Sequence, residues 1–218
     1  MKNMRIVVSG TVGIGKTTTA KILEERLSLT NDDVFLNNEI IEGENPYLDS
    51  YYENRPEWSF LTQMSFLNDR FRAILEEEEK RKKNPNRISI FDRHFLDDYI
   101  FANLKTVKWD MSAFQWNSYD LVNKYFANSL EAEMHPDYFF LLKTSLQTVL
   151  KRIEERNRGS EAAVDVEYWE NMYYHYYEDP KIIEYLKENT KRLIVLEVGD
   201  LTPDEITDEI IKILNKDD

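Results

Sequence analysis

The stretch Gly10-Thr11-Val12-Gly13-Ile14-Gly15-Lys16-Thr17 matches the pattern G-x-x-x-x-G-K-[ST]. It follows the β-branched run 4–9, which predicts a buried strand, and it precedes residues 18–27, which predict a helix. A strand, a glycine-rich turn and a helix in this order are the context in which the pattern forms a phosphate-binding loop. An ordinary strand-turn-helix junction with three glycines is the alternative, and the complete pattern in this context argues against it.

The physical basis of such a loop lies in its glycines. They let successive backbone N–H groups point into one concavity, and the following helix presents its positive end to an anion. Lys16 can reach the β- and γ-phosphates of a nucleoside triphosphate, and Thr17 can offer its hydroxyl to Mg²⁺. The candidate phosphate-binding residues of the loop are Gly10, Thr11, Val12, Gly13, Ile14, Gly15, Lys16, Thr17 and Thr18.

The composition limits the class of protein. The chain has 218 residues, of which 42% are apolar, and this predicts one globular domain over residues 1–218. Its net charge of −13 argues against a nucleic acid polymer as the main partner. It has no cysteine, which excludes disulfides and thiolate metal sites. Because we find no signal peptide and no apolar stretch of transmembrane length, we expect a cytoplasmic protein that does not contact a membrane.

Apolar runs alternate with helical patterns along the rest of the chain. Further strands are expected at 34–36, 87–92, 138–142 and 193–198, and helices at 47–83, 93–104, 112–133, 145–156, 166–188 and 203–214, with Pro56 at a break or a helix start. Strands separated by helices form a parallel sheet that is covered on both faces. We therefore expect an α/β fold with a five-stranded parallel sheet, and ligands at the carboxyl ends of its strands.

Three residues near strand ends are candidates for chemistry. Asp92 ends an apolar strand, as a Walker-B acid does, and such an acid helps to hold Mg²⁺ directly or through water. Arg93 places a cation where a phosphoryl group is transferred, although a surface ion pair is the alternative. Glu39 can accept a proton from a substrate hydroxyl, unless it is simply an exposed loop carboxylate.

Two further groups of side chains lie in or directly after helical segments. Arg152, Arg156 and Arg158 form a basic set in an acidic protein, and the first two share a helix face. This set is either a lid over the transferring phosphate or a helix end decorated with cations. Gln63 lies in the most apolar part of the helix 47–83, where a buried amide needs partners that the edge of a nucleobase would supply.

Together, these residues resemble the deoxyribonucleoside kinase family, which includes deoxycytidine, deoxyguanosine and bacterial deoxyadenosine kinases. The resemblance extends over most of the chain. It rests on the phosphate loop, on Asp92-Arg93-His94, on the series Tyr52, Trp58, Gln63 and Arg70, and on the segment 152–161. The sequence departs from the family pattern at His94, where serine is usual, and at Ile40, where a proline usually follows the glutamate.

The resemblance implies a P-loop kinase fold with an arginine-rich lid, ATP as phosphoryl donor and Mg²⁺ as cofactor. It also implies a homodimer, for which the helix 112–133 is the candidate contact. The implied catalytic residues are Glu39, Arg93 and Lys16, with Glu42 as the alternative base. The implied substrate-binding residues are Glu39, Tyr52, Gln63, Arg70, Arg93, Asp97, Asp98, Phe101 and Glu161, and the choice between Asp97 and Asp98 as the base-selecting aspartate stays open. Thr17 and Asp92 would hold the metal, and Arg152, Arg156 and Arg158 would clamp phosphates.

The expected reaction is ATP-dependent phosphorylation of the 5′-hydroxyl of a deoxyribonucleoside in nucleotide salvage, with deoxyadenosine favoured and deoxyguanosine or deoxycytidine as alternatives. A nucleoside monophosphate kinase of the thymidylate kinase type shares the loop and the Asp-Arg pair. Its acceptor already carries a phosphate, however, so a carboxylate base such as Glu39 is less useful to it. A regulatory GTPase would need D-x-x-G after a strand, and the sequence has no such match.

Overall fold

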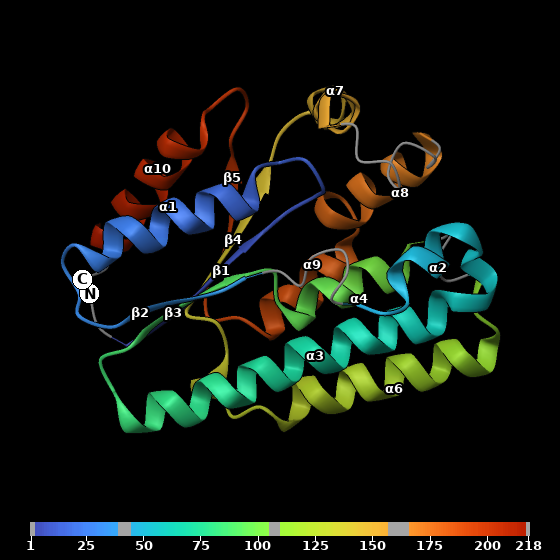
Figure 1. The fold of residues 1–218 in the computed structure, drawn as a ribbon, viewed down its shortest axis with the longest axis horizontal. Coiled ribbons are helices and arrows are strands. Elements are labelled where there is room, and N and C mark those ends of the chain that lie inside the picture. Colours follow the sequence, from blue (N-terminus) through green and yellow to red (C-terminus); the bar gives the residue numbers. More distant parts are fainter. Residues whose placement is uncertain (1–2, 39–44, 105–109, 157–165, 217–218) are drawn as a thin grey trace.

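Five short strands form one parallel sheet in the order β2-β3-β1-β4-β5 (Figure 1). The computed structural model describes residues 3–38, 45–104, 110–156 and 166–216. The strands are β1 (Met4–Ser9), β2 (Val34–Asn37), β3 (Ile88–Asp92), β4 (Tyr138–Lys143) and β5 (Leu193–Glu197). The five-stranded parallel sheet predicted from the sequence is confirmed, with each strand within one residue of its expected bounds.

Helices cover both faces of this sheet. They are α1 (Lys16–Ser28), α2 (Leu48–Glu53), α3 (Arg55–Lys83), α4 (Phe95–Asn103), α6 (Ala113–Ser129), α7 (Leu146–Arg156), α8 (Val166–Tyr177), α9 (Pro180–Glu188) and α10 (Pro203–Lys216), with a 3-10 turn η1 (Ala132–Met134). Figure 1 shows α1 and α10 on one face, and α3, α4, α6 and α9 on the other. The site described below lies where the chain leaves the carboxyl ends of the strands.

Alternate strand residues enter two separate apolar cores. Val7, Phe91 and Phe139 pack under the larger helical layer. Ile6 and Val8 pack instead under α1 and α10. Successive side chains of a strand point to opposite faces, so a strand that is covered on both sides needs a continuous apolar run. Accordingly, the strand residues that enter these two cores are apolar.

Several helix boundaries differ from the prediction, and local hydrogen bonds explain the clearest cases. The helix expected at 93–104 begins only at Phe95, because His94 caps it. The helix expected at 112–133 ends at Ser129, where Leu130 turns extended, and η1 follows. The helix expected at 166–188 is two helices, because Asp179 accepts the N–H of Lys181 at 3.0 Å and starts α9 at Pro180.

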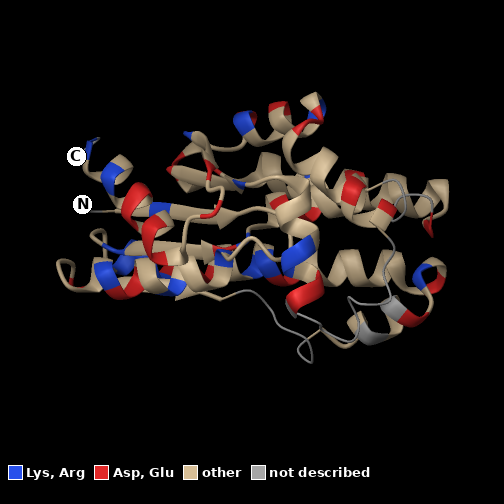
Figure 2. Cartoon of the chain, turned by 90° about the horizontal axis from the view of Figure 1, so that it is seen from above, with Lys and Arg blue, Asp and Glu red and all other residues tan. Residues whose placement is uncertain are grey.

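Within the described parts of the chain, no helix is both long and apolar enough to cross a lipid bilayer. Figure 2, which colours the backbone by residue type, shows acidic positions spread over the helices, with lysine and arginine positions interspersed among them. In this acidic protein, a place where several cationic side chains meet therefore indicates a site that binds anions.

Candidate active site

The phosphate loop leaves β1 and enters α1. Three of its glycines have positive φ angles: Gly10 at 144°, Gly13 at 79° and Gly15 at 98°. A Cβ at Gly10 would lie 2.7 Å from the carbonyl oxygen of Leu142 in β4, so this position admits only glycine. The loop conformation is the one that the motif requires, and it opens the N-terminus of α1 toward an anion.

Lys16 occupies the first position of α1 and is buried. Its Nζ donates a hydrogen bond to the carbonyl oxygen of Thr11 at 2.8 Å, across the loop. The ammonium group therefore lies within the loop that would hold the phosphates. The hydroxyl-bearing Thr17 follows in the first turn of α1 and is partly exposed, and Thr18 is exposed.

Asp92 is the last residue of β3 and pairs with Val8 of β1. Val8 in turn lies two residues before the start of the phosphate loop. The side chain of Asp92 is buried at the end of this apolar strand. Hydroxyl and carboxylate oxygens are ligands that Mg²⁺ accepts, so Thr17 and Asp92 fit this ion. Among the described residues, no group of three or more His, Asp or Glu forms a metal site by itself. A magnesium ion here would therefore take further ligands from phosphate oxygens and water.

Arg93 has a positive φ of 71°, which is strained for a residue other than glycine. Its N–H donates to the carbonyl oxygen of Val8 at 3.2 Å, which fixes the turn after β3. The guanidinium is buried, lies 4.8 Å from the centre of the Phe101 ring, and donates to the hydroxyl of Tyr176 at 2.7 Å. Arg93 is thus a buried, fixed cation beside Asp92, and the alternative of a surface ion pair is wrong.

His94 and Asp97 form a capping box at the start of α4. The Nδ1 of His94 accepts from the N–H of Leu96 at 3.5 Å, and the Asp97 carboxylate accepts from the N–H of His94 at 2.9 Å. Burial is the main cause that lowers the pKa of His94 to about 3, with smaller effects from His135 and Arg70. The residue that replaces the usual serine is therefore a neutral helix cap.

This cap makes stability depend on pH. The unfolded chain binds a proton at His94 below a pKa of about 6.5, and the folded chain does not, so stability falls as pH drops below that value. At pH 5 the loss from His94 alone should be about 2 kcal/mol. Asparagine can accept the same N–H without titrating. Urea unfolding at pH 7.5 and pH 5 should show a drop that is smaller by this amount in His94→Asn, and equal drops in both proteins would contradict the assignment.

The structure separates the two candidate aspartates. Asp98 is buried and forms an ion pair with Arg70 of α3. Burial raises the pKa of Asp98 to about 7, although the adjacent Arg70 acts in the opposite direction. Asp97 instead accepts hydrogen bonds from the hydroxyls of Ser9 and Tyr176. Asp98 is therefore the aspartate that joins α4 to α3.

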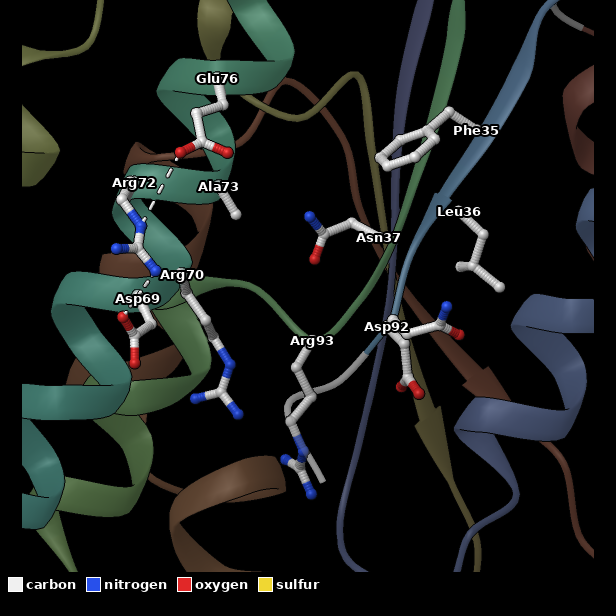
Figure 3. A pocket seen from close by; sticks show the side chains of 11 residues that line it. Phe35, Leu36, Asn37, Asp69, Arg70, Arg72, Ala73, Glu76, Asp92 and Arg93 are labelled. Carbon is white, nitrogen blue, oxygen red and sulfur yellow. Dashed lines mark hydrogen bonds and ion pairs between the residues drawn. The ribbon is translucent and has the colours of Figure 1, made fainter. Parts of the chain in front are cut away.

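A cavity of 410 Å³ lies between β2, α3 and the end of β3 (Figure 3). Arg70, Asp92 and Arg93 line it together. Figure 3 shows Asn37 at the end of β2 pointing toward this space from the opposite side. Asn37, Asn38 and Asp69 were not singled out from the sequence, and their only signal was their position beside Glu39 and Arg70.

The remaining predicted residues fall into three groups. Gln63 is buried on α3, seven residues before Arg70, and Phe101 is partly buried against Arg93. The helix of Arg152 packs on the phosphate loop, because a Cβ at Gly13 would lie 3.5 Å from the Cβ of Arg152. Outside the described parts lie Glu39, Glu42, Arg158, Glu161 and the side chains of Tyr52 and Arg156.

Two tyrosines at the end of α8 contact the site, and the sequence did not predict this. The hydroxyl of Tyr176 contacts Arg93, and the hydroxyl of Tyr177 contacts the backbone of Thr11. The sequence showed only that the segment 166–188 is rich in tyrosine. A helical pattern does not reveal which of its aromatic residues turn a hydroxyl toward the site.

A parallel sheet in this strand order, with a phosphate loop after its central strand, defines a P-loop kinase fold. The deoxynucleoside kinase family model matches residues 6–216. The chain belongs to the deoxynucleoside kinase family.

Individual relatives agree with this assignment. Deoxyadenosine/deoxycytidine kinase of Bacillus subtilis is 32% identical over 182 residues, which cover 80% of this chain and 76% of that enzyme. Deoxyguanosine kinase of the same organism is 32% identical over 193 residues, which cover 88% of this chain and 84% of that enzyme. The structure of deoxyadenosine kinase from M. mycoides with bound dATP superimposes with a TM-score of 0.74 at 26% identity, over 97% of this chain and 99% of that one.

Proposed function

We propose that the protein transfers the γ-phosphoryl group of ATP to the 5′-hydroxyl of a deoxyribonucleoside, with deoxyadenosine preferred. The main support is the cavity that joins Asp92 and Arg93, beside the phosphate loop, to the Arg70–Asp98 pair. One end offers charges for phosphoryl transfer, and the other offers hydrogen-bonding groups for a base. A single cavity with both features suits an acceptor nucleoside.

In this proposal the donor half of the site is the phosphate loop. The loop N–H groups and Lys16 bind the phosphates of ATP. Arg152, together with Arg156 and Arg158, adds positive charge over the phosphates and excludes water, which limits hydrolysis of ATP. Mg²⁺ held by Thr17 and Asp92 would neutralise negative charge on the phosphates.

The acceptor half is built around the cavity. Glu39 takes the proton of the 5′-hydroxyl, and Arg93 orients that hydroxyl and stabilises the charge that develops on transfer. Gln63, Arg70 and Asp98 bind the base and Phe101 lies against it, while Tyr52 and Glu161 bind the sugar. The two oxygens of Asp97 that accept from Ser9, His94 and Tyr176 favour a supporting part for this residue.

Deoxyadenosine is our first choice of acceptor because structures of deoxyadenosine kinase from M. mycoides superimpose over nearly the whole chain. One of these structures contains bound dATP and another contains bound dCTP. Deoxyguanosine and deoxycytidine are the alternatives, since relatives named for each are comparably similar. The test is a turnover panel of the four deoxynucleosides and their 5′-monophosphates with ATP and Mg²⁺. The highest kcat/KM should be with deoxyadenosine, and turnover of monophosphates alone would overturn the proposal.

We also propose that the protein is a homodimer whose two copies contact each other through α6. The cytoplasmic location expected from the sequence stays a prediction. Phe114, Leu121 and Tyr125 are 81%, 70% and 69% exposed, and their spacing places them on one face of the helix. A second copy of the chain would cover this apolar face. Light scattering should show a dimer that Leu121→Glu converts to a monomer, whereas the control Leu29→Glu, at another exposed leucine, should leave it intact. A monomeric unaltered protein would contradict the dimer.

A further inference from the structure

Three tyrosine hydroxyls of α8 reach the carboxyl edge of the sheet. Tyr173 donates to the carbonyl oxygen of Thr144 at 3.0 Å, directly after β4. Tyr176 and Tyr177 lie three and four residues further on, which places all three on neighbouring positions of one helix face. Only the last two touch residues of the proposed active site.

Tyr177 holds the start of the phosphate loop. Its hydroxyl accepts from the N–H of Thr11 at 3.2 Å and donates to the carbonyl oxygen of Leu142 at 2.6 Å. A Cβ at Gly10 would lie 3.3 Å from the same hydroxyl oxygen, so the loop backbone passes directly over it. The carbonyl oxygen of Thr11 in turn accepts from Lys16. The backbone of Thr11 is thus held by Tyr177 on one side and by the loop lysine on the other.

Tyr176 holds Arg93. Its hydroxyl accepts from the Nη1 of Arg93 at 2.7 Å and donates to the Oδ1 of Asp97 at 3.1 Å. The guanidinium itself is 3.9 Å from this carboxylate oxygen. The tyrosine oxygen therefore lies between the cation and the anion and bridges them. The side chain of Tyr176 is fully buried, which leaves little freedom for this arrangement.

We propose that Tyr176 and Tyr177 are positioning residues for phosphoryl transfer: Tyr177 fixes the phosphate loop for ATP, and Tyr176 fixes the Arg93 guanidinium for the acceptor hydroxyl. This inference rests on the proposed function. Both hydroxyls act through another residue and are not themselves placed at the reacting atoms. One helix thereby sets the geometry of the donor half and of the acceptor half separately.

The two tyrosines should therefore affect different quantities: Tyr177 the affinity for ATP, and Tyr176 the turnover number kcat. The substitution Tyr177→Phe removes the hydroxyl that accepts from the N–H of Thr11. The phosphate loop should then be less ordered before ATP binds. We expect the Kd for ATP, measured by calorimetry without nucleoside, to rise about 3- to 10-fold. The kcat at saturating ATP should stay unchanged, because the loop is ordered once the phosphates fill it.

Tyr176→Phe should have the opposite signature. Without the bridging oxygen, the Arg93 guanidinium moves toward Asp97 and away from the acceptor hydroxyl. We expect kcat for the deoxynucleoside to fall about tenfold, as for the loss of one well-placed hydrogen bond in the transition state. The Kd for ATP should stay at the value of the unaltered protein.

Tyr173→Phe is the matched control, because it removes one hydrogen bond from the same helix to the same edge of the sheet. It should change neither parameter, and phenylalanine fills the same space in all three variants, so their melting midpoints should be similar. The inference is overturned if both active-site variants keep the unaltered Kd and kcat, or if all three variants change both parameters together. Absence of turnover by the unaltered protein would contradict the proposed function instead, and the ATP affinities would then still decide the part of Tyr177.

Discussion

Replacement of Arg93 by alanine should lower kcat for deoxynucleoside phosphorylation by about 10²- to 10³-fold, the range found when one preorganised donor to a developing charge is removed. The guanidinium is buried, donates a hydrogen bond to Tyr176 and lies over the ring of Phe101. A cation fixed in this way needs no reorganisation when charge develops on the transferring group. Steady-state kinetics at saturating ATP measure the effect, and the KM for ATP should change little because the phosphate loop is untouched.

Two further variants sharpen this experiment. Arg93→Lys keeps a charge but loses the planar fork that bonds Tyr176, so its kcat should lie between those of the unaltered protein and Arg93→Ala. Arg72→Ala is the matched control, because Arg72 also lines the cavity but its side chain is 70% exposed. A loss of kcat in Arg72→Ala as large as that in Arg93→Ala would refute a special part for Arg93.

Replacement of Glu39 by glutamine should lower kcat by on the order of 10²-fold or more, because the amide cannot take the proton of the 5′-hydroxyl. Asn37 and Asn38, which precede it in the sequence, line the cavity together with Asp92 and Arg93. The isosteric change leaves ATP binding nearly intact, since no part of the phosphate loop is altered. Single-turnover rates with bound ATP and calorimetric ATP affinity check both statements.

The neighbouring acid supplies the control for this variant. Glu42→Gln changes the same group three residues further along the chain and should keep nearly full turnover. Full turnover in Glu39→Gln together with a large loss in Glu42→Gln would move the base to Glu42. If neither variant loses turnover, the chain does not use a carboxylate base from this segment.

Much of the fold could be predicted because its signals are local. The run Ile6-Val7-Val8 predicts a strand buried on both faces, and the glycines of the loop predict a curled backbone, for which the structure shows positive φ angles. The errors occurred where a side chain overrides the helical pattern. His94 delays α4 by capping it, and Asp179 with Pro180 divides the expected helix 166–188. A hydrophobic period does not contain these hydrogen bonds.

By itself, the sequence determined the phosphate loop, the alternating strands and helices, and the acid and arginine at the end of β3, because each depends on residues that are close along the chain. The tertiary structure decided which distant groups meet. It paired Arg70 with Asp98 rather than with Asp97, and it brought Tyr176 and Tyr177 to Arg93 and Thr11. Such contacts depend on how α3, α4 and α8 pack around the sheet, and a buried polar group takes the partner that this packing supplies.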